Sequence, residues 1–437
     1  MFSKIHRFRS VLHATAHQRL SLKRFAAAVI LLTGSSPPLM GAPWNGSVIH
    51  SFTGLGGGYS PIFGTLVQDA SGNLYGTTSD VPSEIRSEQG TVFRLTPDSK
   101  SGKKWKFKNI YHFLGRRRTD PGYPIGGLTM DAQGNLYGTT TVGLVFELSP
   151  PSNGSDDWSY QTIANLESQQ NSALVGSLLL SSSGALFGAS EQSAAYANGS
   201  IFELVPPNGG SGPWTYNLIY AFQGSPDGSH PSAGLMADAQ GNLYGTTSNG
   251  GNAGDVGTVF ELTPPAPGGS AWTETVLYSF AGGATDGSLP LCSLLMDPSG
   301  ALYGTTYEGG PSNNGTVFKL SPPSSAGSSW SESLIHIFSD LQNWGPKGGL
   351  IADSRGSLYG STVSGPNTAG TVFKLSLSAG SKAKWSLKTL WDFPSITDGG
   401  EPKGNLLMTT SGDLYGTAEY GGSNSCQTCG TVFRVAR

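Results

Sequence analysis

The chain repeats one short pattern seven times, and this repeat restricts the possible folds more than any other feature of its 437 residues. The tripeptide Leu-Tyr-Gly, with one Leu-Phe-Gly variant, recurs about every 57 residues. Its third residues are Gly76, Gly138, Gly188, Gly245, Gly304, Gly360 and Gly416. Units repeated in this way stack into one array, so the length of the chain does not indicate several domains.

Three further motifs keep the same spacing. A segment ending in a turn, such as GGLTMDAQGN at residues 126–135, precedes each tripeptide, and Gly-Thr-Val-Phe or a near variant follows it. A tryptophan then stands eight positions before an aromatic residue or leucine. The seven pairs are Trp44 and Phe52, Trp105 and Phe113, Trp158 and Leu166, Trp214 and Phe222, Trp272 and Phe280, Trp330 and Phe338, and Trp385 and Phe393. Each unit therefore holds four short β-prone runs, a to d, as an antiparallel meander requires.

Closure into a ring follows from how these sheets must be covered. One four-stranded sheet leaves both faces short of cover, so seven sheets pack face to face, and a ring leaves no end sheet exposed. The first run, Trp44 to Phe52, is a lone strand d, and the chain stops after a lone strand c at residues 430–435. We predict an all-β, seven-bladed β-propeller of four-stranded antiparallel blades over residues 43–437, closed by the N-terminal strand.

The first 42 residues differ from the rest. They hold six basic residues and no acidic residue, followed by an apolar run at residues 25–32. This pattern predicts a signal peptide, because eight apolar residues are too few to span a bilayer, which needs roughly 20. Without this leader 20 basic and 29 acidic residues remain, a net charge of −9. We expect an exported protein with no membrane span that does not bind nucleic acid.

The order GLxxDxxGNLYGTT, a Gly-Gly loop and GTVFxLTPP resembles the GloVer-type tandem-repeat family, exported bacterial proteins with varied C-terminal anchors. The motifs recur in order over residues 44–437. The resemblance implies a secreted or cell-surface repeat protein, and it implies no particular activity. Only Ala436 and Arg437 follow the last strand c. We therefore expect free secretion rather than attachment through a C-terminal anchor.

Histidine and known motifs offer little catalytic chemistry. His50 and His336 occupy the repeat position of Tyr111 and Tyr220, which indicates packing, and His112 is one residue off that position. His230 alone remains a candidate, because it lies in a d–a loop. The sequence contains no DxDxDG calcium loop, GxSxG motif or HExxH motif. We predict no catalytic residue, no metal site and no cofactor.

The three cysteines fall into two classes. Cys292 replaces glycine or alanine at a small inner-strand position, so we expect a buried thiol. Cys426 and Cys429 form CQTC in the last b–c loop, where a zinc site would lack two ligands. We predict that Cys426 and Cys429 form a disulfide in the exported protein.

Aspartates recur once per unit at the end of strand a. Their spacing predicts a turn-capping role, in which the carboxylate accepts backbone N–H groups of the a–b hairpin. The positions are Asp69, Asp131, Asp238, Asp297 and Asp353.

The sequence determines the function of the protein less closely than its fold. The leading hypothesis is a non-enzymatic binding or scaffold module, monomeric, with an unknown extracellular protein or glycan as partner. The d–a loops vary in length around a recurring Asp and Pro, and variable loops on a rigid scaffold usually carry binding. The predicted binding residues are Asp120, Asp227, His230, Asp286 and Asp398. The same Asp-Gly and Asp-Pro pairs are also explained as turn-shaping residues.

Two alternatives remain. A secreted carbohydrate-active hydrolase or lyase would need carboxylates that converge at the channel mouth, and Glu308 and Glu419 on b–c loops are the candidates. A structural surface-layer component is the third hypothesis, since a propeller fold does not decide among these functions.

Overall fold

The structure is a computed structural model that describes residues 43–437 with short gaps. The gaps are residues 55–57, 63, 80–88, 99–103, 115–121, 153–154, 167–170, 194–196, 211, 253, 326, 340–342, 368, 381–382, 423–425 and 427. The leader expected at residues 1–42 and the candidate Asp120 lie outside the described residues. Among the described residues, no helix is long and apolar enough to cross a lipid bilayer.

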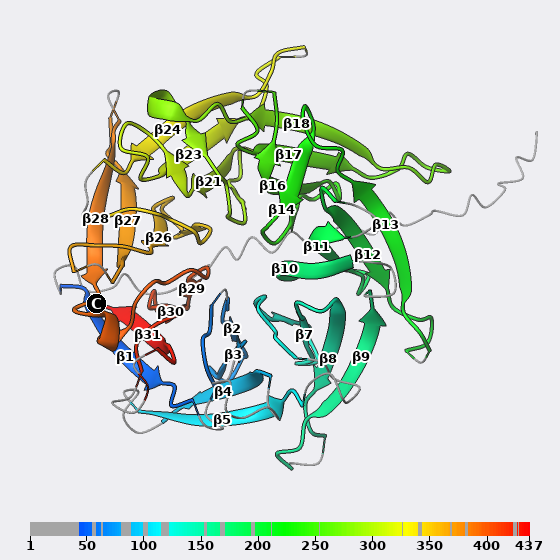
Figure 1. Ribbon diagram of the computed structural model, residues 1–437, viewed down its shortest axis with the longest axis vertical. Coiled ribbons are helices and arrows are strands. Elements are labelled where there is room, and N and C mark those ends of the chain that lie inside the picture. Colours follow the sequence, from blue (N-terminus) through cyan, green and yellow to red (C-terminus); the bar gives the residue numbers. More distant parts are fainter. Residues whose placement is uncertain are drawn as a thin grey trace, which may run out of the picture.

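Seven antiparallel sheets surround a central axis, as predicted (Figure 1). Strands a to d run from the centre outward. Blade 1 comprises β2 (Val67–Gln68), β3 (Leu74–Thr78), β4 (Thr91–Pro97) and β5 (Trp105–His112). Blade 2 comprises β6 (Thr129–Met130), β7 (Leu136–Thr139), β8 (Leu144–Ser149) and β9 (Ser159–Asn165). Blade 3 comprises β10 (Asn171–Leu180), β11 (Leu186–Ser193), β12 (Ser200–Val205) and β13 (Thr215–Ala221).

In blades 4 and 5 the innermost strand is supplemented by a second short segment. Blade 4 comprises β14 (Gly228–Pro231), β15 (Met236–Ala237), β16 (Leu243–Gly250), β17 (Thr258–Thr263) and β18 (Thr273–Ser279). Blade 5 comprises β20 (Leu295–Met296), β21 (Leu302–Thr306), β23 (Thr316–Ser321) and β24 (Ser331–Ile337), with a ribbon of β19 (Gly287–Ser288) and β22 (Glu308–Gly309) beside it.

The remaining strands form blades 6 and 7. They are β25 (Ile351–Ala352), β26 (Leu358–Thr362), β27 (Thr371–Leu377) and β28 (Trp385–Asp392), then β29 (Leu407–Met408), β30 (Leu414–Ala418), β31 (Thr431–Ala436) and β1 (Asn45–Ser51). Two 3₁₀ turns, η2 (Gly283–Thr285) and η3 (Ile396–Asp398), lie in d–a loops.

The repeated tripeptide and the Gly-Thr-Val-Phe motif face each other across strands b and c. Gly76 in β3 pairs with Phe93 in β4, and a Cβ atom on Gly76 would lie 2.6 Å from Cζ of that ring. The phenyl ring therefore lies over the glycine, and any side chain at this position would displace it. The same pairing recurs in all seven blades.

Neighbouring blades share their apolar cores. Phe52 of strand d in blade 7 packs on Phe93 of strand c in blade 1, with ring centroids 5.2 Å apart. The strand-d tryptophans pack on the tripeptide tyrosine of the preceding blade, as Trp158 does on Tyr75 at 5.7 Å. The repeated tryptophans and phenylalanines are thus structural, and they fill the gap that widens toward the outside of the ring.

The N-terminal strand closes the ring. β1 pairs antiparallel with β31, from Asn45 opposite Ala436 to Ser51 opposite Thr431. Two contacts continue the closure inward: Phe52 N donates to Gly430 O at 3.0 Å, and Thr417 Oγ1 donates to Gly64 O at 3.1 Å. The predicted fold class is confirmed, including closure by this strand.

The recurring aspartates cap their hairpins, as predicted. Asp69 Oδ1 accepts the backbone N–H groups of Ser71 and Asn73, both at 2.9 Å. Its Oδ2 accepts the hydroxyl of Tyr75 at 3.0 Å. Burial, followed by the charge of Asp69, raises the pKa of Tyr75 to about 12. Each capped turn therefore also fixes the tyrosine on which the next blade's tryptophan packs.

Cys292 is the buried thiol that the sequence predicted. Its side chain is fully covered, and Sγ donates to Thr305 O at 3.2 Å. Its carbonyl accepts Thr246 Oγ1 of the preceding blade at 2.9 Å. Burial raises the pKa of the thiol, which keeps it protonated and unreactive.

Deleting residues 43–53 should lower the melting temperature by about 10 °C or more, because β31 becomes an exposed edge and Phe93 loses its cover. Differential scanning calorimetry measures this. The matched point variant Thr417→Val removes only the hydrogen bond to Gly64 and should cost about 1 kcal/mol. A truncated protein that melts cooperatively at the parent temperature would contradict the closure.

Candidate functional site

The d–a and b–c loops meet on one face of the ring. β19 of the d–a loop pairs with β22 of the b–c loop, Gly287 opposite Gly309. In blade 7 the two loops form a bridge between Gly400 and Tyr420. We call this the d–a face; the a–b and c–d connections lie on the opposite, a–b face.

At one equivalent position of the d–a loop, every blade holds a residue in the left-handed backbone region. These residues are Ser60, Tyr123, Ala173, His230, Leu289, Gly345 and Glu401, with φ between 49° and 70°. Six of the seven directly precede a proline, and residues other than glycine rarely adopt this conformation. The prolines recur in the sequence, but the unusual backbone of the residue before each of them was not predicted, although the same motif marks its position.

Contacts with the preceding blade hold this unusual backbone. His230 N donates to Asn198 O at 2.8 Å, and Leu289 N donates to Val256 O at 2.9 Å. Pro231 packs on Gly199, where a Cβ atom would lie 2.5 Å from the proline Cδ. Gly199 itself has φ of 87°, so this glycine is required both for its backbone and for the approach of the next loop.

Asp227 and Asp286 occupy equivalent positions and hold their loops in the same way. Asp286 Oδ2 accepts Tyr278 Oη at 3.0 Å and Ala281 N at 2.7 Å, while Oδ1 accepts Gly287 N at 2.6 Å. Asp227 makes the matching bonds to Tyr220, Gln223 and Gly228. These carboxylates thus shape the d–a loops, as the turn-shaping alternative expected.

Asp398 and His230, the other predicted binding residues within the described part of the chain, differ in burial and in hydrogen bonding. Asp398 is exposed, and its Oδ2 accepts Ser395 Oγ at 2.7 Å at the end of η3. His230 is half-buried in β14, and its Nδ1 is buried without a hydrogen-bond partner among the described residues. His50 packs flat on Phe107 with ring centroids 4.0 Å apart, and burial lowers its pKa to about 4. His50 therefore has the packing role that the sequence indicated.

A charged cluster on blades 6 and 7 was missed by the sequence analysis. Lys403 Nζ lies 3.0 Å from Glu401 Oε2 and also contacts Glu419 Oε2. Burial disfavours the charge of Lys403, but these two carboxylates outweigh it and raise its pKa. Lys347, which follows Pro346 as Lys403 follows Pro402, lies 4.6 Å from the Tyr307 ring centroid. The Pro-Lys pairs of two consecutive units were the available signal.

The carboxylates proposed for an enzyme do not form a free pair. Glu419 is engaged by Lys403, and Glu308 lies in β22 of blade 5. No group of three histidine, cysteine or acidic residues that could hold a metal ion occurs among the described residues.

Two strand-d acids have strongly altered pKa values. Burial, followed by the charge of Asp227, raises the pKa of Glu274 to about 7, and burial with Asp286 does the same for Glu332. Each has a buried Oε1 with no partner in the described part of the chain. Both side chains therefore destabilise the fold when they are ionised.

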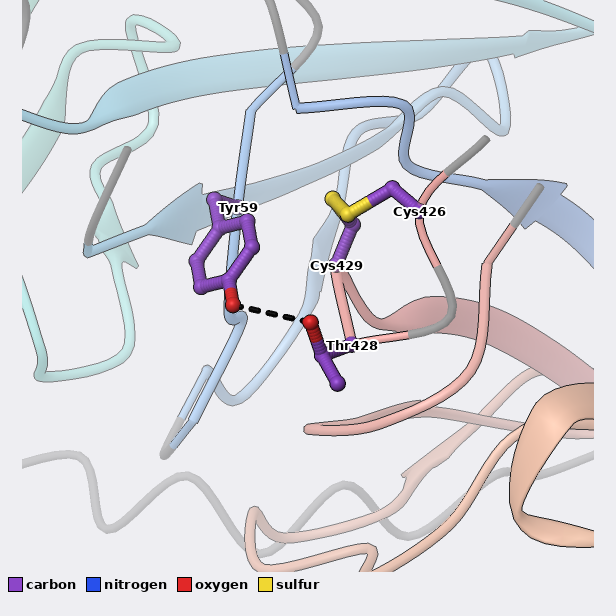
Figure 2. The surroundings of a disulfide bond; sticks show 4 residues. All are labelled: Tyr59, Cys426, Thr428 and Cys429. Carbon is purple, nitrogen blue, oxygen red and sulfur yellow. Dashed lines mark hydrogen bonds between the residues drawn. A yellow bond between two sulfur atoms is a disulfide. The ribbon is translucent and has the colours of Figure 1, made fainter. Parts of the chain in front are cut away.

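Cys426 and Cys429 are joined by a disulfide, with Cα atoms 5.5 Å apart (Figure 2). The loop that carries it contacts the segment between β1 and β2. Tyr59 Oη lies 2.9 Å from Thr428 Oγ1, and Ser60 N donates to Cys429 O at 2.9 Å. The disulfide thus braces the loop against which the first d–a connection packs.

Glu274→Gln and Glu332→Gln should each raise the free energy of unfolding at about pH 8, because each removes a half-buried carboxylate that is charged at this pH. We expect a gain of about 1 kcal/mol, which is less than the pKa shift alone would give because solvent screens these partly exposed groups. The folded protein binds more protons than the unfolded chain between pH 4.5 and about 7, so this destabilisation grows as pH rises through that window. Urea unfolding at about pH 4 should show no difference. The control is Glu203→Gln, whose carboxylate bonds Asn217, and equal gains in all three variants would contradict the assignment.

Alkylation of denatured, unreduced protein should modify Cys292 alone, since Cys426 and Cys429 are bonded to each other. Mass spectrometry counts the added groups. Alkylation of all three cysteines would rule the disulfide out.

Comparison with known proteins agrees with this architecture. Residues 141–330 match the Gloeobacter/Verrucomicrobia repeat, and no curated protein matches the chain. Solved structures with the same fold include PorZ, a surface component of the type-IX secretion system of Porphyromonas gingivalis. Its TM-score is 0.52 at 12% identity, with 87% of this chain and 47% of that chain covered.

Two further structures are similar at lower TM-scores. The extracellular domain of BT4673 from B. thetaiotaomicron has a TM-score of 0.48 at 14% identity, over 94% of this chain and 41% of that chain. A Trichoderma reesei protein of carbohydrate-active enzymes family AA12 has a TM-score of 0.44 at 14% identity, over 97% and 99%. At 12% identity, the comparison with PorZ shows the fold alone. The repeat matched over residues 141–330 and the propeller fold support a repeat-containing propeller family, in agreement with the family that the motifs of the chain resemble.

Proposed function

We propose that the protein is an exported binding propeller, without catalytic activity, that recognises an extracellular protein or glycan with its d–a face. One observation carries this proposal. Seven residues of different chemistry stand at one repeated backbone position of the d–a loops, and six of them directly precede a proline. The backbone there is uniform and the side chains are not.

Uniform backbone with varied side chains suits recognition. Hydrogen bonds to the preceding blade hold the loops at Ser60, Tyr123, His230, Leu289 and Glu401, so little ordering is needed when a ligand binds. The partly exposed side chains at these positions are a phenol, an imidazole, an aliphatic group and a carboxylate, while the Ser60 hydroxyl is buried. Such a set can bind one partner specifically, whereas a ring of identical residues would only repeat a single contact seven times.

Each sequence-predicted residue receives a role in this proposal. Asp227 and Asp286 position the loops, because three hydrogen bonds already occupy each carboxylate. His230 contacts the ligand through its half-buried ring, and the exposed Asp398 does so at the rim. Asp120 belongs to the corresponding loop of blade 2. We further propose a secreted monomer, whose net charge of −9 after loss of the leader disfavours anionic partners.

The ligand can be sought with a glycan array and with capture of proteins from the culture medium by the purified protein. Once a ligand is bound, the triple variant Asp227→Asn, His230→Ala, Asp286→Asn should weaken binding at least about tenfold with the fold retained. The matched control is Gln240→Ala with Arg355→Ala, two exposed residues of a–b turns. Unchanged binding in the triple variant, or loss in the control, would place recognition elsewhere.

A further inference from the structure

A pocket of about 770 Å³ opens on the a–b face between blades 2 and 3, which are neighbours in Figure 1. The a–b turns of both blades and the c–d loop of blade 3 form its walls. Its lining includes Asp131, Tyr137, Glu147, Gln161 and Trp214. This volume falls within the range of about 300–1,000 Å³ that is typical of small-ligand sites.

The equivalent gap between blades 1 and 2 is bridged by charged side chains. Arg94 of strand c and Lys108 of strand d, both in blade 1, reach Asp156 of the next c–d loop, at 3.4 and 2.8 Å. In blade 2 the corresponding positions hold Glu147 and Gln161. The loop facing them, residues 206–214, contains no charged residue. The two side chains therefore have no ionic partner there, and the gap stays open.

The pocket combines an aromatic wall with hydrogen-bonding groups that remain available. Trp214 lines it and packs against Tyr137, with ring centroids 6.2 Å apart. Glu147 Oε1 accepts Ser149 Oγ at 3.1 Å, and no hydrogen bond to Oε2 is made within the described structure. Gln161 is exposed, and its carboxamide can both donate and accept.

Both carboxylate oxygens of Asp131, by contrast, already accept hydrogen bonds from the protein. Its Oδ1 accepts Gln133 N at 2.9 Å and Asn135 N at 2.8 Å, and its Oδ2 accepts Asn135 Nδ2 and Tyr137 Oη. It positions Tyr137 and the turn. Glu147 and Gln161 are then the groups that a ligand would contact directly.

We propose that this pocket binds a neutral sugar unit of a glycan, separately from the d–a face. A sugar ring presents an apolar C–H face suited to Trp214 and a rim of hydroxyl groups suited to a carboxylate and a carboxamide. A ligand that was wholly apolar would leave Glu147 desolvated without a donor, which is unfavourable. A ligand that carries only an ammonium group would use Glu147 and the indole face, but it would leave the N–H donors of Gln161 without an acceptor.

The test titrates the purified protein with cellohexaose, xylohexaose, mannohexaose and chitohexaose by isothermal titration calorimetry, up to about 10 mM. At least one of these neutral oligosaccharides should bind. Glu147→Ala and Gln161→Ala should each weaken that binding at least about tenfold, with the melting temperature unchanged. The matched controls are Glu203→Ala and Asn217→Ala, the equivalent residues of blade 3, which bond to each other at 3.0 Å and lie outside the pocket.

Three results would overturn the proposal. One is failure of all four oligosaccharides to bind the folded protein. Another is binding that the Glu147 and Gln161 variants leave unchanged, which would locate the sugar elsewhere. The third is binding of spermidine that depends on Glu147 while no sugar binds, which would make the pocket an amine site. Variants of His230 on the d–a face should not alter sugar binding, so this test is independent of the proposed d–a face function.

Discussion

The contact between a glycine of strand b and a phenylalanine of strand c sets the geometry of every blade. At the seven repeated glycines a Cβ atom would come within 2.4 to 2.6 Å of the facing ring, so the ring must lie flat over bare backbone. In six of the seven blades it meets a phenylalanine of the preceding blade, as Phe93 meets Phe52, and in blade 3 Phe202 lies in one core cluster with Leu166. One intra-blade contact thus determines how closely consecutive blades pack, and the ring closes because its last interface repeats the others.

Much of this was predictable because each determinant is local and repeated. The number of blades, closure by β1, the Asp69-type turn caps and the buried Cys292 all follow from residue types at fixed positions within one unit. The left-handed residues before proline were not predicted. Their backbone depends on a carbonyl and a glycine of the preceding blade, as at His230, and periodicity within a unit does not reveal a contact between units.

Candidate site residues were harder to assign for a related reason. An aspartate in a variable loop can bind a ligand or accept hydrogen bonds from its own loop, and the residue type is identical in both cases. Asp286 is buried and accepts two hydrogen bonds from its own loop and one from Tyr278 of β18, whereas Asp398 is exposed on a short turn. Only the positions of nearby N–H and hydroxyl donors separate these roles. The Lys403 cluster was not predicted, because its partners Glu401 and Glu419 lie on two different loops that only the fold brings together.

The two faces of the ring differ in how they can acquire specificity. On the d–a face, inter-blade hydrogen bonds keep the backbone constant, so a substitution at a position such as Leu289 changes the surface chemistry without moving the loop. On the a–b face, the gaps between blades are closed or left open by side chains alone. Arg94 and Lys108 fill one gap through Asp156, whereas Glu147 and Gln161 leave the next one open. Between blades 2 and 3 two strand positions and the facing loop all lack basic residues, and the gap is open, whereas at the same positions of blade 3 Glu203 and Asn217 bond to each other.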